Sequence, residues 1–187
     1  MRIISGTCKG RKLTALEGRD IRPTSDRIKE TIFNILGPQV KKAKVLDLFA
    51  GTGALGLEAL SRGASHAVFV DISVAACNMI QHHIDDCRFF EKAGLIRHDI
   101  FTGLLPPSVM SHCFDLIFMD PPYDRGYVSN ILENQNIFSL LSDGGIVVAE
   151  HATKEILPHT LNGLDIFRQK KYSRTTISFL TKTQHQP

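Results

Sequence analysis

The sequence predicts an α/β fold built around a doubly wound, mainly parallel β-sheet. Apolar runs of strand length alternate with stretches long enough to form helices, and this alternation requires crossovers between parallel strands. A glycine-rich turn follows the first run, and several later runs carry an acidic residue at their end. With 187 residues, of which 43% are hydrophobic, the chain can bury the core of one globular domain.

The expected parallel strands are five short apolar runs, at residues 45–49, 67–71, 95–99, 116–120 and 146–150. The expected helices between them cover residues 54–62, 74–87 and 127–141. Two more runs, 164–172 and 175–181, are separated only by Ser173 and Arg174, which is too short a connection for a crossover. They should form an antiparallel hairpin, so the sheet should gain an antiparallel strand at its C-terminal side.

The N-terminal segment is organised differently from the rest of the chain. Residues 2–5 and 11–14 flank GTCKG and predict a small β-hairpin. A helix is expected over residues 26–36, with Thr24 or Ser25 as its N-cap. The apolar face of this helix is formed by Ile28, Ile32, Ile35 and Leu36.

Positive charge is concentrated in this N-terminal part. Residues 1–44 contain eleven Lys and Arg against four Asp and Glu, a net charge of +7, whereas the whole chain carries only +3. Such segregation is typical of a basic arm that meets a polyanion, although a solvated surface is the simpler explanation of charge alone. We interpret residues 1–24 as a basic hairpin or arm for RNA and residues 25–187 as the catalytic domain.

The stretch VLDLFAGTGALGLEAL contains Gly51-x-Gly53-x-x-Gly56 between an expected strand and an expected helix. With Asp71 20 residues after Gly51, this pattern matches the dinucleotide fingerprint, so a nicotinamide or flavin oxidoreductase is one interpretation. Asp47 argues against it, because a carboxylate just before the turn would lie near a doubly anionic pyrophosphate. The same carboxylate suits the ammonium group of S-adenosylmethionine, whose ribose Asp71 could bind. By itself, a glycine-rich turn indicates only a sharp strand-to-helix connection.

Two further acidic residues, Asp99 and Asp120, are expected at the ends of later strands. In an open parallel sheet, ligands bind at the carboxyl ends of the strands, so Asp47, Asp71, Asp99 and Asp120 should rim one crevice. Asp99 could accept a hydrogen bond from an adenine amine. For any single member of this set, an Asp that caps a loop is at least as good an explanation.

The fourth expected strand ends on Asp120-Pro121-Pro122-Tyr123. The two prolines have no backbone N–H and fix φ, so they make a rigid loop whose carbonyl groups stay available as acceptors. An exocyclic amine of a nucleobase offers two N–H donors, which the Asp120 side chain and the Pro121 carbonyl could both accept. This would free the nitrogen lone pair for attack on a methyl group, while Tyr123 offers a face for base stacking. Two prolines alone would indicate only a turn, but after this glycine motif the loop indicates methyl transfer to a base.

Together these motifs resemble a known family. FAGTG followed by DPPY is similar to amino-methyltransferases that use S-adenosylmethionine, and MRIISGTCKGRKL, RPTSDRIKETIFNIL and VLDLFAGTGALGLEALSRGA resemble the RsmD-type 16S ribosomal RNA guanine-N2 methyltransferases. The resemblance runs from residue 1 to about Tyr123. It implies a Rossmann-like class I methyltransferase fold. It also implies transfer of a methyl group from S-adenosyl-L-methionine to the exocyclic N2 amine of one guanine of 16S rRNA in the small ribosomal subunit, number 966 in the standard numbering of that RNA.

The resemblance also implies roles for individual residues. The cofactor would be lined by Asp47, Phe49, Gly51, Gly53, Asp71, Ile72, Asp99 and Ile100. The catalytic loop that receives the base would be Asp120, Pro121, Pro122 and Tyr123. Arg22, Thr24 and Arg27 match a family motif near the active site and would bind substrate, although an Arg there could equally be a surface residue at a helix start. From the charge of the basic arm we add Lys9, Arg11 and Lys12 as RNA-binding residues.

Other features bear on location and on alternative functions. The four cysteines and eight histidines form no ligand pattern, so we expect no metal and no covalent intermediate. The charged N-terminus without an apolar h-region, and the lack of a long apolar run, predict a cytoplasmic protein with no membrane segment. We expect a monomer.

Three alternative functions remain from the sequence. An oxidoreductase would depend on Gly51-x-Gly53-x-x-Gly56 alone. A DNA adenine-N6 amino-methyltransferase would use the same DPPY loop, but such enzymes usually need additional residues for target recognition. A non-catalytic RNA-binding module would depend on the basic arm alone.

Overall fold

The computed structural model describes residues 1–14, 25–102, 105–122, 126–134 and 137–183. The chain divides into two compact units, Met1–Asp99 and Ile100–Pro187. Among the described helices, none has the length and apolar character that crossing a membrane requires.

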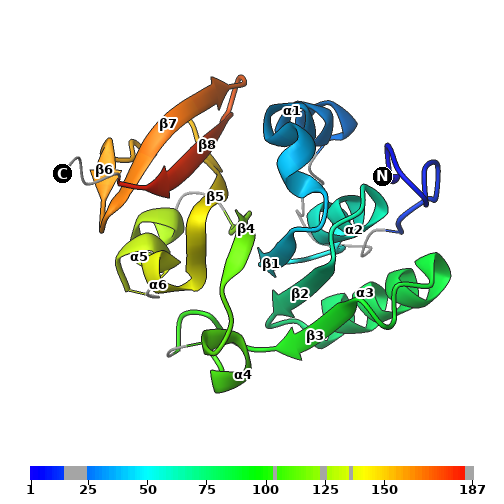
Figure 1. Ribbon diagram of the computed structural model, residues 1–187. Coiled ribbons are helices and arrows are strands. Elements are labelled where there is room, and N and C mark those ends of the chain that lie inside the picture. The colour runs from blue at the N-terminus through cyan, green and yellow to red at the C-terminus, as the bar shows by residue number, and fades with distance from the viewer. Residues whose placement is uncertain (15–24, 103–104, 123–125, 135–136, 184–187) are drawn as a thin grey trace. The chain divides into compact units, whose positions relative to one another are not determined.

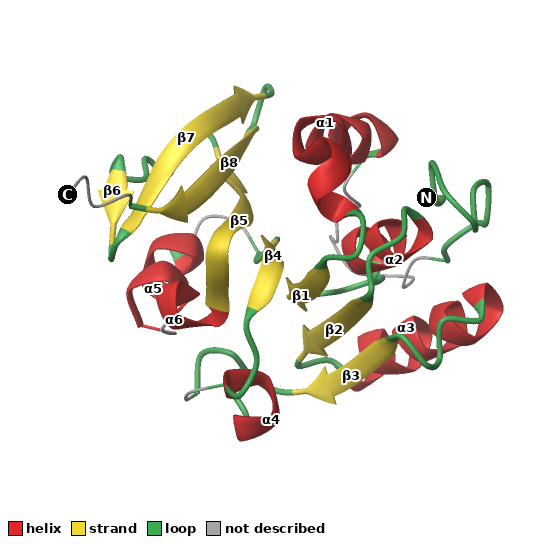
Figure 2. Cartoon of the chain, viewed as in Figure 1, coloured by secondary structure: helices red, strands yellow, loops and turns green. Residues whose placement is uncertain are grey.

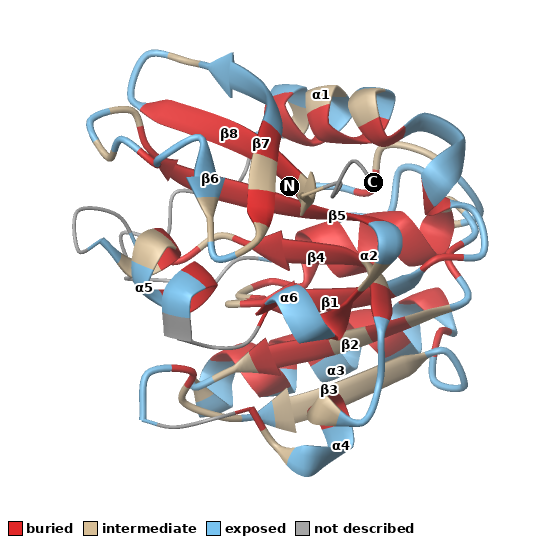
Figure 3. Ribbon diagram, turned by 60° about the vertical axis from the view of Figure 1, so that its left-hand side comes forward, coloured by how far each residue is buried: buried red, intermediate tan, exposed pale blue. Residues whose placement is uncertain are grey.

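The first unit contains three parallel strands in the order β3-β2-β1, with the bounds β1 Lys44–Leu48, β2 His66–Asp71 and β3 Ala93–Arg97. Helix α2 (Ala54–Ser61) connects β1 to β2, and α3 (Val74–Cys87) connects β2 to β3, so both connections are the crossovers that parallel strands require (Figure 1). β1 is buried from its second residue onward (Figure 3), because it has a neighbouring strand and a helix packed on it.

Helix α1 (Asp26–Leu36) and the 3₁₀ helix η1 (Gly37–Val40) precede β1. Ser25 is the N-cap of α1, because its side chain accepts a hydrogen bond from the Ile28 N–H over 3.3 Å. The predicted apolar face is buried at Ile28, Ile32 and Leu36. The expected N-terminal hairpin is shorter than predicted, since a single bridge between Arg2 and Lys12 takes the place of two four-residue strands.

The second unit contains five strands in the order β4-β5-β8-β7-β6. Their bounds are β4 Phe114–Met119, β5 Leu141–Ala152, β6 Thr160–Leu161, β7 Leu164–Lys171 and β8 Thr175–Lys182. β4 and β5 are parallel, whereas β5, β8, β7 and β6 pair antiparallel, so the predicted C-terminal hairpin is confirmed (Figure 2). The helices of this unit are α4 (Pro107–Met110), α5 (Tyr127–Asn134) and α6 (Ile137–Leu140).

Several predicted boundaries were wrong by two residues or more. β3 ends at Arg97, so Asp99 lies two residues beyond a strand that was expected to include it. β5 begins at Leu141, five residues before the predicted start at residue 146, because Leu141 pairs with Phe114 of β4 although the following Ser-Asp-Gly-Gly has low strand propensity. The single helix expected over residues 127–141 is two helices, α5 and α6.

Gly56 should be required for close packing between α2 and β2. A Cβ at this position would lie 2.3 Å from Cε1 of the fully buried Phe69 and 3.1 Å from Oδ2 of Asp47. Gly56→Ala should therefore lower the free energy of unfolding by about 1–3 kcal/mol, even though Ala favours helices. Gly94→Ala is the matched control, because its Cβ would meet its nearest neighbours at 3.7 Å. Urea denaturation measures both, and equal stability would show that Phe69 moves aside without cost.

Candidate active site

The turn between β1 and α2 brings together Gly51, Gly53 and Asp71, three of the predicted cofactor residues. Gly51 and Gly53 have φ angles of +56° and +74°, which glycine adopts without steric penalty. The Gly51 N–H donates to Oδ2 of Asp71 over 2.8 Å, so the end of β2 holds the turn. Within the described part of the chain, a Cβ at Gly51 would meet only the Phe49 carbonyl oxygen, at 3.8 Å. The backbone of the turn therefore faces space that a ligand could occupy.

Asp71 combines a structural contact with spare capacity for hydrogen bonds. Its Oδ1 accepts the Ser73 N–H over 2.8 Å, and Ser73 in turn caps α3. An ionised carboxylate offers about four lone-pair sites, so two backbone donors leave room for further donors such as hydroxyl groups. The following residue, Ile72, is 59% exposed. A half-buried carboxylate beside an exposed apolar side chain suits a ligand that carries both a diol and a flat ring.

Asp47 lies inside β1 and is almost fully buried, at 3% exposure. Its Oδ2 accepts the Gly56 N–H in the first turn of α2 over 2.9 Å. Burial is the main cause that raises the pKa of this carboxyl from 3.8 to about 8; the hydrogen bond from the Gly56 N–H opposes the shift, and the nearby Asp71 adds to it. A cation brought close to Asp47 would favour its ionised form.

Asp99, Ile100 and the predicted catalytic loop lie further along the chain. Asp99 is half-buried at the end of the first unit, and Ile100, at 2% exposure, begins the second. Asp120 directly follows β4 and is half-buried, while Pro121 is buried and Pro122 is exposed. Tyr123 lies outside the described residues.

The predicted RNA-binding residues that the structure describes are all on the surface. Lys9, Arg11, Lys12 and Arg27 are exposed, while Arg22 and Thr24 lie outside the described residues. A pocket of about 350 Å³ adjoins this segment and is lined by Met1, Arg2, Lys12, Leu13, Thr14 and Asp26. Two cationic side chains therefore border a hollow next to the start of α1.

Glu58 of α2 anchors the N-terminal segment, and sequence analysis did not identify it. Its fully buried carboxylate accepts the N–H groups of Ile4 and Ser5 over 2.7 Å and 3.0 Å, and the Arg62 Nε–H over 2.7 Å. The Ser61 hydroxyl adds a further hydrogen bond between α2 and the N-terminal segment, because it donates to the Ser5 carbonyl over 2.6 Å. The acid offered no signal in the sequence, since most glutamates in helices are on the surface.

His83 of α3 is a second functional candidate that sequence analysis missed. It is 3% exposed, and its ring lies between two distant segments. Nδ1 lies 3.0 Å from the Thr52 carbonyl oxygen, while Nε2 lies 3.1 Å from the Thr14 nitrogen and 3.0 Å from the Thr14 hydroxyl. The carbonyl can only accept and the backbone N–H can only donate, so the ring is the neutral tautomer with its hydrogen on Nδ1. Burial lowers the pKa of His83 from 6.5, which favours this neutral form.

Comparison with known proteins decides the family. The family described as conserved hypothetical protein 95 matches residues 1–181. The chain belongs to this family of RsmD-type methyltransferases. Among the described residues, no group of three or more His, Cys, Asp and Glu side chains could hold a metal ion.

Individual relatives cover nearly the whole chain. YlbH of Bacillus subtilis strain 168, provisionally named an rRNA methyltransferase, is 37% identical over 182 residues, 97% of this chain and 99% of that protein. The ribosomal RNA small subunit methyltransferase D of Escherichia coli K12 is 34% identical over 175 residues, 91% of this chain and 84% of that protein. The solved structure of E. coli yhhF, provisionally named a methyltransferase, has a TM-score of 0.78 at 29% identity and covers 97% of both chains. The predicted Rossmann-like class I methyltransferase fold is confirmed.

Asp47→Asn should change how the stability of this methyltransferase depends on pH. In the folded protein the pKa of Asp47 is raised from 3.8 to about 8, so the unfolded chain loses this proton first as the pH rises. The folded state then binds more protons than the unfolded state, and stability falls between these two pKa values. Asn cannot ionise, yet its Oδ1 can still accept the Gly56 N–H. Urea denaturation from pH 4 to pH 8 should show the variant gaining on the wild type with rising pH. A constant difference would mean that Asp47 ionises normally.

Proposed function

We propose that this enzyme transfers a methyl group from S-adenosyl-L-methionine to the N2 amine of guanine 966 of 16S rRNA in the small ribosomal subunit. The proposal depends chiefly on Asp120-Pro121-Pro122 standing directly after β4 in a chain 34% identical to the E. coli protein named ribosomal RNA small subunit methyltransferase D. The same loop in another family could serve adenine, so the choice of guanine comes from the resemblance of the sequence motifs to the RsmD-type enzymes.

The first unit fits S-adenosylmethionine by the chemistry of its side chains. When bound, this cofactor supplies a methyl group activated on a sulfonium. Asp71 would accept the ribose hydroxyls with its remaining lone pairs, and the exposed Ile72 would pack against the adenine ring. Gly51 and Gly53 would let the ligand approach the backbone, and Asp47 would become ionised beside the ammonium group. Phe49, Asp99 and Ile100 complete the proposed set.

The loop after β4 would act on the target amine. Asp120 would accept one N–H of guanine N2 and receive the proton that the nitrogen loses when it is methylated. The Pro121 carbonyl would accept the second N–H, because the two prolines fix the loop and leave its carbonyl groups available as acceptors. Pro122 stiffens the loop, and Tyr123 would stack on the base. The base must leave its stack to enter such a site, which is easiest in a loop or single strand.

The exposed cations of the N-terminal segment would bind the RNA backbone. Lys9, Arg11 and Lys12 lie on a loop that Glu58 and Ser61 hold in place, and Lys12 also borders the adjoining pocket. A fixed loop loses little entropy when it binds, so its cations are well suited to phosphate contacts. Arg22, Thr24 and Arg27 remain proposed substrate contacts next to this loop in the chain.

The direct test uses small ribosomal subunits from a strain that lacks the corresponding gene. The purified protein and radiolabelled S-adenosylmethionine should label 16S rRNA, and mass spectrometry of nuclease fragments should place the methyl group on guanine 966. Duplex DNA that contains adenine serves as the competing substrate. Labelling of a different nucleotide, or of the DNA alone, would contradict the proposed function.

Asp120→Ala should impair methyl transfer, whereas Asp71→Ala should impair cofactor binding. Asp120→Ala should reduce methyl transfer by orders of magnitude and leave the affinity for S-adenosylhomocysteine nearly unchanged, because Asp120 acts on the amine. Asp71→Ala should weaken that affinity by about 1.5–3 kcal/mol, the typical value of a hydrogen bond to a charged group. Calorimetry and a methyl-transfer assay separate the two. Equal losses of binding in both variants would place Asp120 in the cofactor site.

A further inference from the structure

The end of the chain carries a second concentration of positive charge, separate from the N-terminal segment. Residues 166–187 contain five Lys and Arg and no Asp or Glu, so their net charge is +5. Residues 45–165 contain six basic and fifteen acidic residues, a net charge of −9. Positive charge is therefore gathered at both ends of the sequence.

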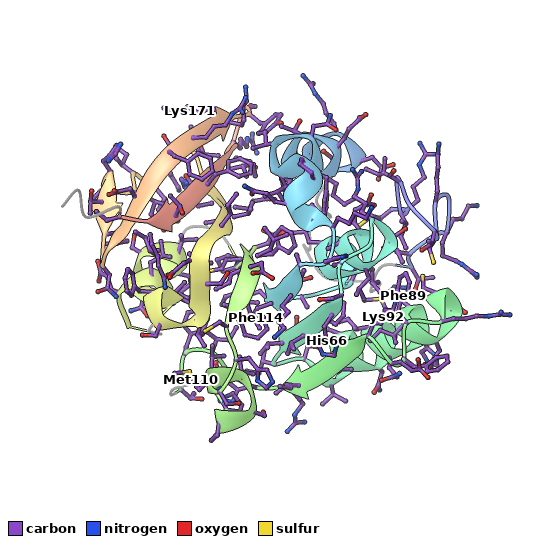
Figure 4. The ribbon with its side chains drawn as sticks, in the orientation of Figure 1. His66, Phe89, Lys92, Met110, Phe114 and Lys171 are labelled. Carbon is purple, nitrogen blue, oxygen red and sulfur yellow. The ribbon has the colours of Figure 1, made fainter. Side chains whose placement is uncertain are left out.

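Most of this second concentration lies on the hairpin of β7 and β8. Arg168, Lys170 and Lys171 are exposed on β7, and Arg174 is exposed in the turn that follows. Figure 4 shows Lys171 at the end of the hairpin. Within the described part of the chain, none of these four cations forms an ion pair with a carboxylate. The described carboxylates therefore do not neutralise their charge.

The outer edge of β7 is also accessible. β6 pairs with β7 only at Leu164 and Asp165, and in the described residues no other strand borders this edge beyond Asp165. Phe167 is 50% exposed, and its ring centre lies 6.2 Å from that of the buried Phe179. Packing against Phe179 holds one side of the ring and leaves the rest for another aromatic group to stack on.

Protection of the edge is the simplest alternative explanation for these cations. Edge strands often carry lysine because charge prevents pairing with another chain. That explanation does not account for Phe167, since an exposed aromatic ring on an unpaired edge promotes the association that the charge would prevent. A strand that offers both cations and an aromatic face matches the needs of single-stranded RNA, whose phosphates and bases both require partners.

We propose that the basic hairpin, residues 167–174, is a second RNA-docking surface of this enzyme. Arg168, Lys170, Lys171 and Arg174 bind phosphate groups of the rRNA, and Phe167 stacks on an unpaired base. The proposal rests on the proposed function, because it assigns a further surface to the same RNA substrate. It gives the C-terminal part of the chain a role that no sequence motif indicated.

The test compares two variants with the same change in net charge. The hairpin variant carries Arg168→Gln, Lys170→Gln and Lys171→Gln, and the control carries Lys41→Gln, Lys42→Gln and Lys92→Gln, three exposed cations of the first unit. Binding of protein-free 16S rRNA is measured at several salt concentrations, together with S-adenosylhomocysteine affinity and thermal unfolding. Each lost phosphate contact should reduce the log–log salt slope by about 0.7–0.9, so the hairpin variant should lose about 2 and the control much less.

Two further measurements sharpen the result. Phe167→Ala should weaken RNA binding at every salt concentration without changing the slope, because stacking releases no counterions. Replacement of Lys9, Arg11 and Lys12 by Gln should reduce the slope independently, and the two effects should add. Equal slopes for the hairpin variant and the control would overturn the proposal. So would a loss seen with whole small subunits but not with protein-free rRNA, since the surface would then dock a ribosomal protein. Failure of the wild type to methylate guanine 966 would contradict the proposed function, and it is measured separately from these binding experiments.

A different observation concerns His83, whose ring joins the two segments to which RNA and cofactor are assigned. The Thr52 carbonyl belongs to the glycine turn, between Gly51 and Gly53, and Thr14 belongs to the N-terminal segment that carries Lys9, Arg11 and Lys12. Met1 adds a second link, because its Sδ lies 3.8 Å from the Thr52 hydroxyl. Movement of either segment would break a hydrogen bond to a buried ring.

We infer that His83 is a positioning residue that couples RNA binding to cofactor binding. In the wild type, bound rRNA should tighten S-adenosylhomocysteine, and by linkage the cofactor product should tighten rRNA by the same factor. His83→Phe keeps a ring but removes its hydrogen bonds to Thr14 and Thr52, so each ligand alone should bind nearly as before while the factor falls to one.

His82→Phe is the matched control, because His82 is the exposed neighbour on the same helix, and it should keep the full coupling factor. His83→Gln, whose amide can both donate and accept, should restore part of the factor. If His83→Phe does not fold, Thr14→Val, which removes one of the contacts to Nε2, should give a partial loss. No coupling in the wild type, or full coupling in His83→Phe or in a folded Thr14→Val variant, would overturn the inference. If His83 had a purely structural role, His83→Phe would lower the affinities for rRNA and for S-adenosylhomocysteine and would leave the coupling factor between them unchanged.

Discussion

Hydrogen bonds from backbone N–H groups to the carboxyl groups of two aspartates on neighbouring strands hold the glycine turn, and the rest of the proposed site depends on them. Asp47 of β1 accepts the Gly56 N–H, and Asp71 at the end of β2 accepts the Gly51 N–H. The first bond fixes the start of α2, and the second fixes the start of the turn. Because both acceptors belong to neighbouring parallel strands, the register of the sheet determines the shape of the turn. The buried carboxyl of Asp47 keeps its proton to a pH near 8, so the turn is held without a full buried charge.

A second buried carboxylate determines where the N-terminal basic segment lies. Glu58 accepts two backbone N–H groups of that segment. Burial lowers the pKa of Lys29, and the nearby Glu58 opposes this shift. The Lys29 ammonium is fully buried and donates to the Arg2 carbonyl, with Asp26 at 3.7 Å. Buried charges are tolerated only with such partners, so α1, α2 and the N-terminal loop are tied to one another. The exposed cations of the loop are therefore presented from a fixed base, in contrast to a free tail.

The sequence predicted those features that local pattern determines. α3 has the predicted bounds because Ser73 caps it and its apolar residues follow helical spacing, and the hairpin of β7 and β8 follows from a connection of only a few residues. Features that depend on distant partners were not predictable. β5 begins as early as Leu141 because Leu141 pairs with Phe114 of β4, and the contacts of His83 join residues 31 and 69 positions away in the chain. The roles of Asp71 and Asp47 as acceptors for the turn were likewise hidden, since a strand-end acid looks the same whether it faces a ligand or a backbone N–H.

The division of charge along the chain is consistent with a protein that handles two ligands of opposite sign. The residues proposed to hold S-adenosylmethionine, a ligand with two positive groups, all belong to the acidic stretch 45–165. The residues proposed to hold RNA lie outside it, in the basic stretches at either end. Acidic side chains around a cofactor repel phosphate, so the RNA backbone is better held elsewhere, whereas an uncharged base can approach them. Because RNA binding is assigned to the basic stretches at either end of the sequence, residues 45–165 can be acidic enough to bind a cationic cofactor.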